Sequence, residues 1–511
     1  MRAAGAAQSA EMAERTDAPL GGHAGHAAVQ RRTLRVLVAG QVLGGVGLAA
    51  GVAVGALLAR DLLSGDSLTG LPVAVATAGG ALTAPPLARL MDARGRRPGL
   101  ALGYLLGALG SVIVVTAAAL GSFALLLAGM VLFGGGNTAS LLARYAGADL
   151  ALPLQRGRAV STVLFATTFG AVAGPNLIDA TGAAARAVGL PELSGPFALS
   201  GLAYVAAALV VGIALRPDPL LLARAVDPEA DPAAPAPLTG RGGWSDLAHG
   251  PALTGVSAMV TAQLVMVGVM TMTPLHMRAH GHGLQVIGLV ISVHIAGMYL
   301  FSPLVGQLAD RVGRMPTLRF GAGALAAAGA LAAFADPASS VVLGGALFLL
   351  GLGWSLCLVA GSTLLVDAVP VARRAQAQGK ADLMLGLAGA TGGLGSGFLL
   401  GAAGFAAVGL LAAVISVVFL GPRWVRDANV PADAGAWMAR DHPTRLTTGA
   451  PAASPPAPAR RSRRGPRRTG RWRSCAARDR PPRPGPRLRS GTARSPARRA
   501  RPARHGPARR R

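Results

Sequence analysis

Methionine and histidine side chains concentrate in one segment of the chain, residues 259–298. This segment holds six of the 13 Met and four of the nine His. Two pairs have a spacing of four residues, which places both members on one face of a helix; they are Met266 with Met270 and His294 with Met298. Thioether sulfur and neutral imidazole nitrogen are ligands that Cu(I) prefers, and an empty site made of them carries no charge. The two pairs therefore predict a site for a soft metal ion.

The depth of these side chains in a membrane follows from their places in two apolar segments. Met266 and His294 each lie ten residues from the outer end of their segment, so we expect them at the same level. At 1.5 Å per residue, Met270 and Met298 then lie about 6 Å to either side. This arrangement is a ladder of ligands along a path. The alternative is that methionine, a flexible apolar side chain, only fills space between helices.

Three further histidines lie between the two apolar segments: His276, His280 and His282. They could capture a metal ion at the outer surface, or they could be solvated loop residues. The sequence contains no Gly-Lys-Ser/Thr phosphate-binding loop, so we expect transport without ATP hydrolysis. The protein is not expected to be an enzyme. No cofactor is expected, and copper would be the transported substrate.

The composition indicates that helices in a membrane position these side chains. Of 511 residues, 52% are hydrophobic and 14% are charged, whereas a soluble protein has about 25% charged residues. Apolar segments long enough to cross the hydrocarbon core as helices recur at 36–58, 68–88, 98–119, 122–143, 159–179, 197–215, 252–275, 284–305, 317–335, 340–362, 381–402 and 404–421. The predicted fold is an all-α integral membrane protein with twelve transmembrane helices.

A charged phrase occurs twice, 218 residues apart, and each copy joins two apolar segments. Five positions match at this offset, among them Asp92 with Asp310. Such an Asp can accept hydrogen bonds from helix N-terminal amides or from an Arg, and the contact can hold one conformation. The candidate gating residues are Asp92, Gly95, Arg96, Arg97, Gly306, Asp310, Arg311, Gly313 and Arg314. The repeat predicts two related six-helix bundles.

These features divide the chain into five parts. We expect a disordered cytoplasmic lead at 1–30, bundles at 31–215 and 251–425, a Pro-rich cytoplasmic linker at 216–250, and a disordered Arg/Pro-rich tail at 426–511. Low-complexity sequence of the kind found in the tail cannot bury a core.

The net charge of +27 is unevenly distributed, and its distribution predicts the orientation. Residues 423–511 hold 25 Arg and 4 Asp. In the rest of the chain, all basic residues but three fall on one side of the predicted membrane; the exceptions are Arg60, Arg186 and Arg278. By the positive-inside rule, we expect both termini and both charged phrases to be cytoplasmic. The expected location is a bacterial cytoplasmic (inner) membrane. Membrane lipid and a small substrate or metal ion are the expected partners; nucleic acid is not expected, and the protein is expected to be monomeric.

The charged phrases resemble the loop signature of the major facilitator superfamily, G-x-L-A-D-R-x-G-R-R. The second copy is closer to this pattern, because the first has Ala88 for the leading Gly and Ala93 for the first Arg. The resemblance covers about residues 31–425 and implies two bundles around a central cavity that opens to either side in turn. The Met/His spacing is similar to that of the CcoA-like copper importers of this superfamily, which implies copper uptake.

Two observations bear on the alternatives. Gly170, Gly174 and Pro175 resemble the G-x-x-x-G-P element of proton-coupled antiporters, which favours proton-coupled efflux of a small organic molecule or drug. However, no carboxylate falls in the middle third of a predicted span, and Asp382 lies at a cytoplasmic end. Arg144 also lies at a cytoplasmic end, so the antiporter pattern of a buried Arg in the fourth span is missing. A pump for cationic drugs usually needs an acid within the membrane. Copper uptake by alternating access is therefore the leading prediction, and a non-transporting membrane sensor or scaffold is a third.

Overall fold

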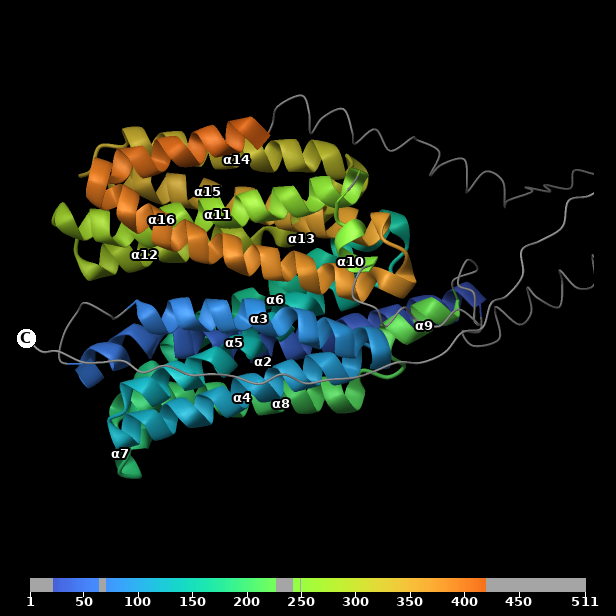
Figure 1. The fold of residues 1–511 in the computed structure, drawn as a ribbon, viewed down its shortest axis with the longest axis horizontal. Coiled ribbons are helices and arrows are strands. Elements are labelled where there is room, and N and C mark those ends of the chain that lie inside the picture. The colour runs from blue at the N-terminus through green and yellow to red at the C-terminus, as the bar shows by residue number, and fades with distance from the viewer. Residues whose placement is uncertain (1–21, 64–69, 227–241, 249, 420–511) are drawn as a thin grey trace, which may run out of the picture. The chain divides into compact units, whose positions relative to one another are not determined.

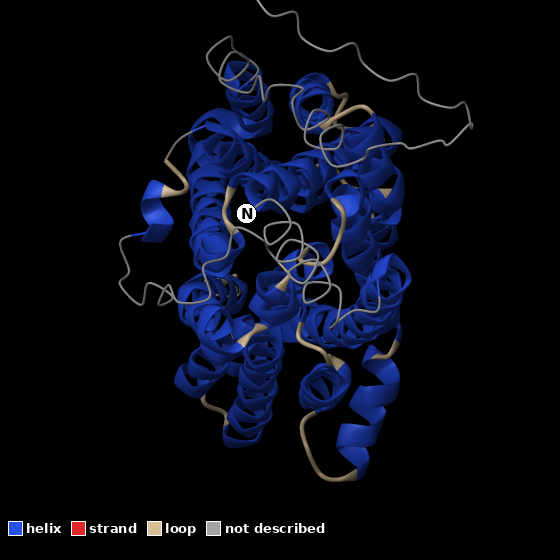
Figure 2. Cartoon of the chain, turned by 90° about the vertical axis from the view of Figure 1, so that its right-hand side faces the viewer, coloured by secondary structure: helices blue, strands red, loops and turns tan. Residues whose placement is uncertain are grey.

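The computed structural model describes residues 22–63, 70–226, 242–248 and 250–419. The chain separates into two compact units, residues 1–439 and 440–511, and every described residue belongs to the first. The predicted tail lies outside the described residues, as do parts of the predicted lead and linker. All regular secondary structure in the described ranges is helical (Figure 2).

The first half of the chain forms one group of helices, drawn from blue to green in Figure 1. They are α2 (Gly22–Leu63), α3 (Leu71–Arg94), α4 (Arg96–Leu120), α5 (Phe123–Ala148), η1 (Pro153–Gln155), α6 (Arg156–Asn176), α7 (Ile178–Ala187), η2 (Glu192–Ser194) and α8 (Gly195–Ala214). The prediction that residues 22–30 belong to a disordered lead is wrong. This Ala-rich segment continues α2, and Gln30 Nε2 donates to the Gly147 carbonyl at 2.8 Å.

The second half forms the other group in Figure 1. It consists of α11 (Gly250–Ala279), α12 (Leu284–Ile295), the π-helical turn η3 (Ala296–Leu300), α13 (Ser302–Arg311), α14 (Arg314–Phe334), α15 (Ser340–Ala368) and α16 (Val371–Phe419). Between the halves, the linker contributes the short helices α9 (Pro219–Ala225) and α10 (Gly242–Ser245).

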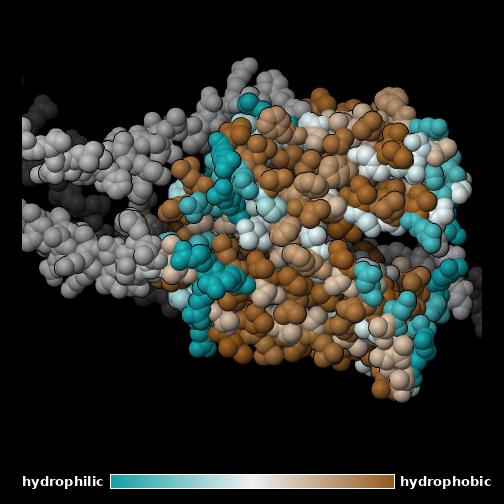
Figure 3. All heavy atoms as spheres, turned by 180° about the vertical axis from the view of Figure 1, so that it is seen from behind, coloured by the Kyte–Doolittle hydropathy of each residue, from teal (hydrophilic) through white to brown (hydrophobic). Residues whose placement is uncertain are grey.

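The predicted apolar segments all fall in helices, within the described ranges. Ten of the described helices are long and apolar enough to cross a membrane, or eleven if α6 and α7, which meet at 54°, form one broken span. The last two predicted segments both lie in α16, where non-helical Gly404 (φ 80°) separates them. Figure 3 shows the resulting apolar band between two hydrophilic rims. The all-α membrane fold is confirmed.

Glycines of the charged phrases shape the end of the molecule that we call the hinge end. Gly95 and Gly313 turn the chain between α3 and α4 and between α13 and α14, with φ of 89° and 107°. Only glycine adopts such values readily. At Gly306 a Cβ would lie 2.1 Å from the Ser161 Oγ, so α13 packs directly on α6 of the other half. Small residues thus let the two halves meet closely.

Candidate functional site

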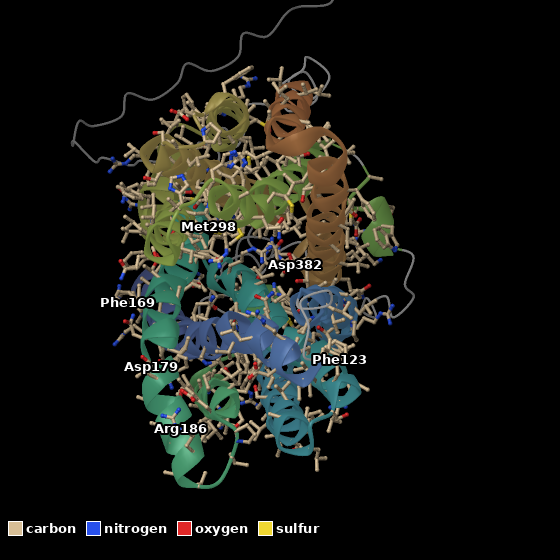
Figure 4. The ribbon with its side chains drawn as sticks, turned by 90° about the vertical axis from the view of Figure 1, so that its left-hand side faces the viewer. Phe123, Phe169, Asp179, Arg186, Met298 and Asp382 are labelled. Carbon is tan, nitrogen blue, oxygen red and sulfur yellow. The ribbon has the colours of Figure 1, made fainter. Side chains whose placement is uncertain are left out.

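A cavity of about 140 Å³ lies between the two halves. Its walls come from α3 and α5 of the first half and from α11, η3, α15 and α16 of the second. Figure 4 shows Met298 and Asp382 facing the region between the halves. Apart from Gly, Ala and Leu, the lining consists of Thr77, Asn137, Thr138, Gln263, Met266, Met298, Tyr299, Trp354 and Asp382.

A buried charge pair joins the halves at this cavity. Arg144 of α5 donates to Asp382 of α16 at 2.6 Å, and both side chains are at most 2% exposed. Arg144 also donates to Ser362 Oγ at 3.1 Å and to the Tyr145 hydroxyl at 2.9 Å. The prediction that Asp382 lies at a helix end is wrong, because α16 begins at Val371, ten residues before the predicted segment. Arg144 lies near the end of α5, which finishes at Ala148, and its side chain is fully buried there.

Several polar groups on the cavity wall are available to a solute. Trp354 Nε1 donates to Gln263 Oε1 at 2.7 Å, which leaves the Gln263 amide nitrogen directed elsewhere. The Tyr299 ring packs edge-on against Trp354, with ring centroids 5.7 Å apart. In the part of the chain that the structure describes, the Asn137 amide and the Tyr299 hydroxyl make no hydrogen bond. The wall thus offers an aromatic surface beside hydrogen-bonding groups.

Two of the four predicted metal ligands line the cavity. Met266 of α11 and Met298 of η3 both line it. Met270 packs against the apolar core instead, and His294 Nδ1 lies 2.8 Å from the Leu347 carbonyl oxygen of α15. Among the described residues, no cluster of three or more His, Cys, Asp or Glu could hold a metal ion. The predicted ladder is therefore present only in part.

The π-helical turn η3 explains why His294 and Met298 have different surroundings. It begins at Ala296, between these two residues. Because a π turn has a wider hydrogen-bonding period than an α-helix, the rule that residues four apart share a face does not extend across it. In addition, α12 packs mainly on α15 and has few contacts with α11. His294 Nε2 is buried without a hydrogen-bond partner in the described structure.

The histidines predicted as an entry funnel lie at the end of the second half opposite the hinge end. The rings of His276 and His280 have centroids 4.4 Å apart, and His276 stacks on Phe405 at 4.2 Å. His282 Nε2 lies 2.8 Å from the Pro337 carbonyl oxygen, in the connection between α14 and α15. The structure therefore pairs His276 with His280, while His282 is bound to a different loop.

The first charged phrase is contacted by the second half and by the linker. The Asp92 carboxylate accepts a hydrogen bond from Gln376 Nε2 of α16 at 2.6 Å and forms an ion pair with Arg224 of α9. The backbone amide of Arg97 donates to Asp218 at 2.8 Å. Asp218 also caps the N-terminus of α9. The linker is therefore attached to the hinge end of the first half.

Arg96 extends these contacts into the interior. Its side chain is fully buried, and its Nε donates to Asp149 at 2.7 Å. Its Nη2 donates to Gln378 Oε1 of α16 at 2.6 Å. Arg374 of α16 is also buried, and its Nε and Nη1 have no hydrogen-bond partner among the described residues. Charged and polar side chains thus connect the two halves in the region between the hinge-end surface and the cavity.

Residues of the second charged phrase, which belong to the second half, contact the first half. The Asp310 carboxylate accepts hydrogen bonds from the backbone amides of Gly157 and Arg158, at the N-terminus of α6, both at 2.9 Å. Arg314 forms an ion pair with Asp367 at 3.2 Å. The same phrase also contains Arg311, which is exposed. Contacts of both phrases close the hinge end, whereas Figure 3 shows a hollow between the halves at the opposite end.

The predicted helix motif of α6 packs on α2. A Cβ at Gly170 would lie 2.4 Å from the carbonyl carbon of Gly45, and one at Gly174 would lie 2.8 Å from the Ala49 Cβ. Pro175 lies next to the end of α6, where the chain bends into α7. The two glycines therefore serve close helix packing.

Similar proteins agree with this architecture. The sequence matches the Major Facilitator Superfamily over residues 36–357 and 258–474. It is 42% identical, over 394 residues (76% of this chain and 90% of the relative), to the uncharacterized MFS-type transporter YdeG of Bacillus subtilis. It is 28% identical, over 400 residues (78% and 97%), to the riboflavin transporter RfnT of Brucella anthropi. The proton:xylose symporter XylE has the same fold, with a TM-score of 0.61 at 17% identity over 77% of this chain and 95% of XylE.

These similarities do not extend to the copper-importer branch that the Met/His spacing resembles. They do agree with the apolar helices, the repeated phrase and the central cavity described above. The chain is a multi-pass membrane protein and a secondary transporter, and it belongs to the Major Facilitator Superfamily.

Proposed function

We propose that this transporter carries a small polar organic solute through the cavity between its halves and that Asp382 couples the movement to protons. The Asp382 carboxylate is the observation on which the proposal rests, because it is buried, lines the cavity and is paired with Arg144 of the other half. Ionisable groups at such depth are costly and are retained mainly for function. The lack of an embedded acid was the argument against proton coupling, and the position of Asp382 removes it.

Protonation gives Asp382 a direct effect on the contact between the halves. The neutral carboxyl group cannot form an ion pair with Arg144, so proton uptake weakens a contact that joins the two halves beside the cavity. Separation of the halves in turn exposes Asp382 to water, where a proton can be exchanged. Proton transfer and cavity opening are therefore coupled through one pair of side chains.

The chemistry of the cavity wall favours a planar solute with a polar rim. Trp354 and Tyr299 offer an aromatic surface, and Asn137 and Gln263 offer amide groups beside it. Aromatic rings pack well on such surfaces. The similar protein RfnT is named a riboflavin transporter, and riboflavin has this combination of a ring system and hydrogen-bonding groups. Riboflavin is therefore the first solute to test.

Copper uptake is the second candidate, since Met266 and Met298 line the same cavity. Two thioethers can hold a soft cation weakly, and Asp382 lies on the same wall. His294 does not contribute from its position against α15. The organic solute has more groups available to it in this cavity than copper has.

Orientation and gating belong to the same proposal. The hinge end carries the basic residues of both charged phrases, so we place it on the cytoplasmic side of a bacterial inner membrane. The contacts of Asp92, Arg96, Asp310 and Arg314 hold this end closed, and their release opens the cavity to the cytoplasm.

Uptake into proteoliposomes distinguishes the two substrates. We expect labelled riboflavin to accumulate under a pH gradient with the wild type. Asp382→Asn should lose this accumulation but retain exchange of riboflavin across the membrane, because the amide imitates the protonated acid. Asp179→Asn is the matched control, since Asp179 is exposed on α7 and lies far from the cavity (Figure 4).

Copper uptake is measured on the same vesicles. If copper is the substrate, Met266→Leu combined with Met298→Leu abolishes copper uptake, whereas Met272→Leu, a substitution in the apolar core, does not. Accumulation of riboflavin that is unchanged in Asp382→Asn would contradict proton coupling through this residue. Copper accumulation without riboflavin transport would contradict the organic solute and support copper as the substrate.

A further inference from the structure

A second cavity, separate from the transport cavity, lies at the hinge end between α2 and α6 and has a volume of about 370 Å³. Its polar lining consists of Gln30, Arg31, Gln155, Arg158 and Thr162, and the remaining wall is Ala and Leu. The lining residues, all of them described, include no Asp or Glu. We propose that this cavity binds the headgroup of an anionic phospholipid with free hydroxyl groups, the chemistry of phosphatidylglycerol.

Two guanidinium groups supply the charge. Arg31 comes from the first helix of the bundle and Arg158 from the first turn of α6. Within the described residues, neither side chain forms an ion pair, in contrast to Arg96, Arg144 and Arg314. Basic pockets between transmembrane helices near the cytoplasmic surface suit lipid phosphates.

The side chain of Gln30 favours a ligand that carries a hydrogen-bond donor next to its phosphate. Its Nε2 is fixed by the hydrogen bond to the Gly147 carbonyl at 2.8 Å, which determines the position of its Oε1. This Oε1 is buried and has no partner among the described residues. A buried acceptor without a donor is unfavourable. A headgroup hydroxyl beside the phosphate would satisfy it, whereas a fully ionised phosphate has no proton to donate.

The position of the cavity favours a lipid over a soluble anion. α6 belongs to the lateral surface, since Phe169 is 55% exposed and lies at the edge of the molecule in Figure 4. Leu34 and Ala159 continue the cavity wall from the polar groups towards the apolar band. A lipid can therefore place its phosphate on Arg31 and Arg158 while its acyl chains follow the apolar surface.

The site also adjoins the contact between the halves. The backbone amide of Arg158 donates to Asp310, whose own cation is Arg314. A headgroup held by the Arg158 side chain fixes the first turn of α6, on which α13 is held by Asp310. We therefore expect the bound lipid to stabilise the closed hinge end.

Native mass spectrometry of the full-length chain in detergent tests the assignment, with phosphatidylglycerol and phosphatidylcholine as probes. We expect phosphatidylglycerol to bind more tightly. Arg31→Gln combined with Arg158→Gln should weaken its binding by about 25-fold, since each basic side chain near an anionic lipid contributes about fivefold. The matched control is Arg32→Gln combined with Arg35→Gln, which removes the same charge from exposed positions outside the cavity.

Three results would overturn the proposal. Equal binding of phosphatidylcholine would show that charge is not recognised. Equal loss in the control pair would show that only net charge matters. Displacement of the lipid by millimolar inorganic phosphate would show a site for a soluble anion. Gln30→Leu provides the remaining measurement, because it should reduce the preference for phosphatidylglycerol over phosphatidic acid if the headgroup hydroxyl is recognised.

Discussion

The pair formed by Arg144 and Asp382 gives the sharpest prediction, because its roles in stability and in transport can be separated. Asp382→Asn keeps the shape of the side chain and removes its charge. Arg144 then retains Ser362 and Tyr145 as neighbours but loses an anion 2.6 Å away in an environment where neither partner is more than 2% exposed. Removal of one partner of a buried ion pair costs about 3–5 kcal/mol. We expect a loss of this size in the free energy of unfolding.

The double substitution Arg144→Met with Asp382→Leu should recover most of this loss. Two apolar side chains of similar volume often match or exceed the stability of a buried ion pair, because they avoid the cost of removing two charges from water. Transport driven by a pH gradient should nevertheless be absent from the double variant. Asp382→Asn would then lose both stability and coupling, whereas the double variant would regain stability without regaining coupling.

Thermal unfolding in detergent and riboflavin uptake into proteoliposomes measure the two quantities on the same preparations. Asp179→Asn, on exposed α7, controls for the loss of a carboxylate. If the double variant still accumulates riboflavin under a pH gradient, the charge pair is a structural contact and the coupling argument is wrong. If Asp382→Asn is as stable as the wild type, the ion pair does not stabilise the protein, and another anion or water pairs with Arg144.

Three further predictions concern the hinge end and the cavity wall. Asp310→Asn removes the negative charge of a carboxylate that accepts hydrogen bonds from two backbone amides of α6, so the hinge end should open more often. A single cysteine introduced at the hinge end of a variant without native cysteines should then be labelled faster. Unchanged labelling would contradict a gating role. Gly95→Ala should lower stability more than Gly313→Ala in thermal unfolding, since both glycines have positive φ but only the Cβ at Gly95 meets a carboxylate, that of Asp218, at 2.4 Å. Trp354→Phe should raise the KM for riboflavin with little change in the maximal rate, because it keeps the aromatic ring and removes the hydrogen bond that positions Gln263; a lowered maximal rate with unchanged KM would argue against a role in binding.

The fold could be predicted from the sequence because its two strongest signals are local. Apolar length identifies a membrane helix without knowledge of its neighbours, and the repeated phrase with Gly95 and Gly313 marks equivalent turns in the two halves. The same local signals failed where polar residues belong to a membrane helix. The start of α16, from Val371 onwards, is polar in sequence, so the predicted apolar segment begins only at residue 381.

The buried position of Asp382 could not be predicted from hydropathy. Polar residues near the start of α16 face the other half of the protein and not lipid. Hydrogen bonds to that half offset the free-energy cost of burying them, and these partners are distant in sequence. One signal was available, since Gln378 and Asp382 are four residues apart and share a helix face. In the structure each binds an arginine of the first half, Arg96 and Arg144. A polar face on a helix that otherwise reads as apolar indicates contact with another bundle.

Only two of the four side chains of the predicted metal ladder line the cavity, for a related reason. Spacing alone identified two side chains that line the cavity, Met266 and Met298. It could not reveal the π-helical turn after Ile295 or the carbonyl group of Leu347 that binds the His294 ring. Both depend on packing against α15, a helix distant in sequence. Rules of helical periodicity hold within one regular helix, and the functional residues of this chain lie where a helix is irregular or where it meets the other half.

The contacts of Arg96 and Arg144 with the second half also constrain how the transporter can move. Arg96 and Arg144 belong to the first half, whereas Gln378 and Asp382 belong to the second. Opening the hinge end must separate both contacts, and a buried ion pair that loses one partner is strongly unfavourable. Opening therefore requires that water or solute replace the lost partner, or that a proton neutralise Asp382. In the proposed mechanism the solute and the proton do this together, which ties transport of one to transport of the other.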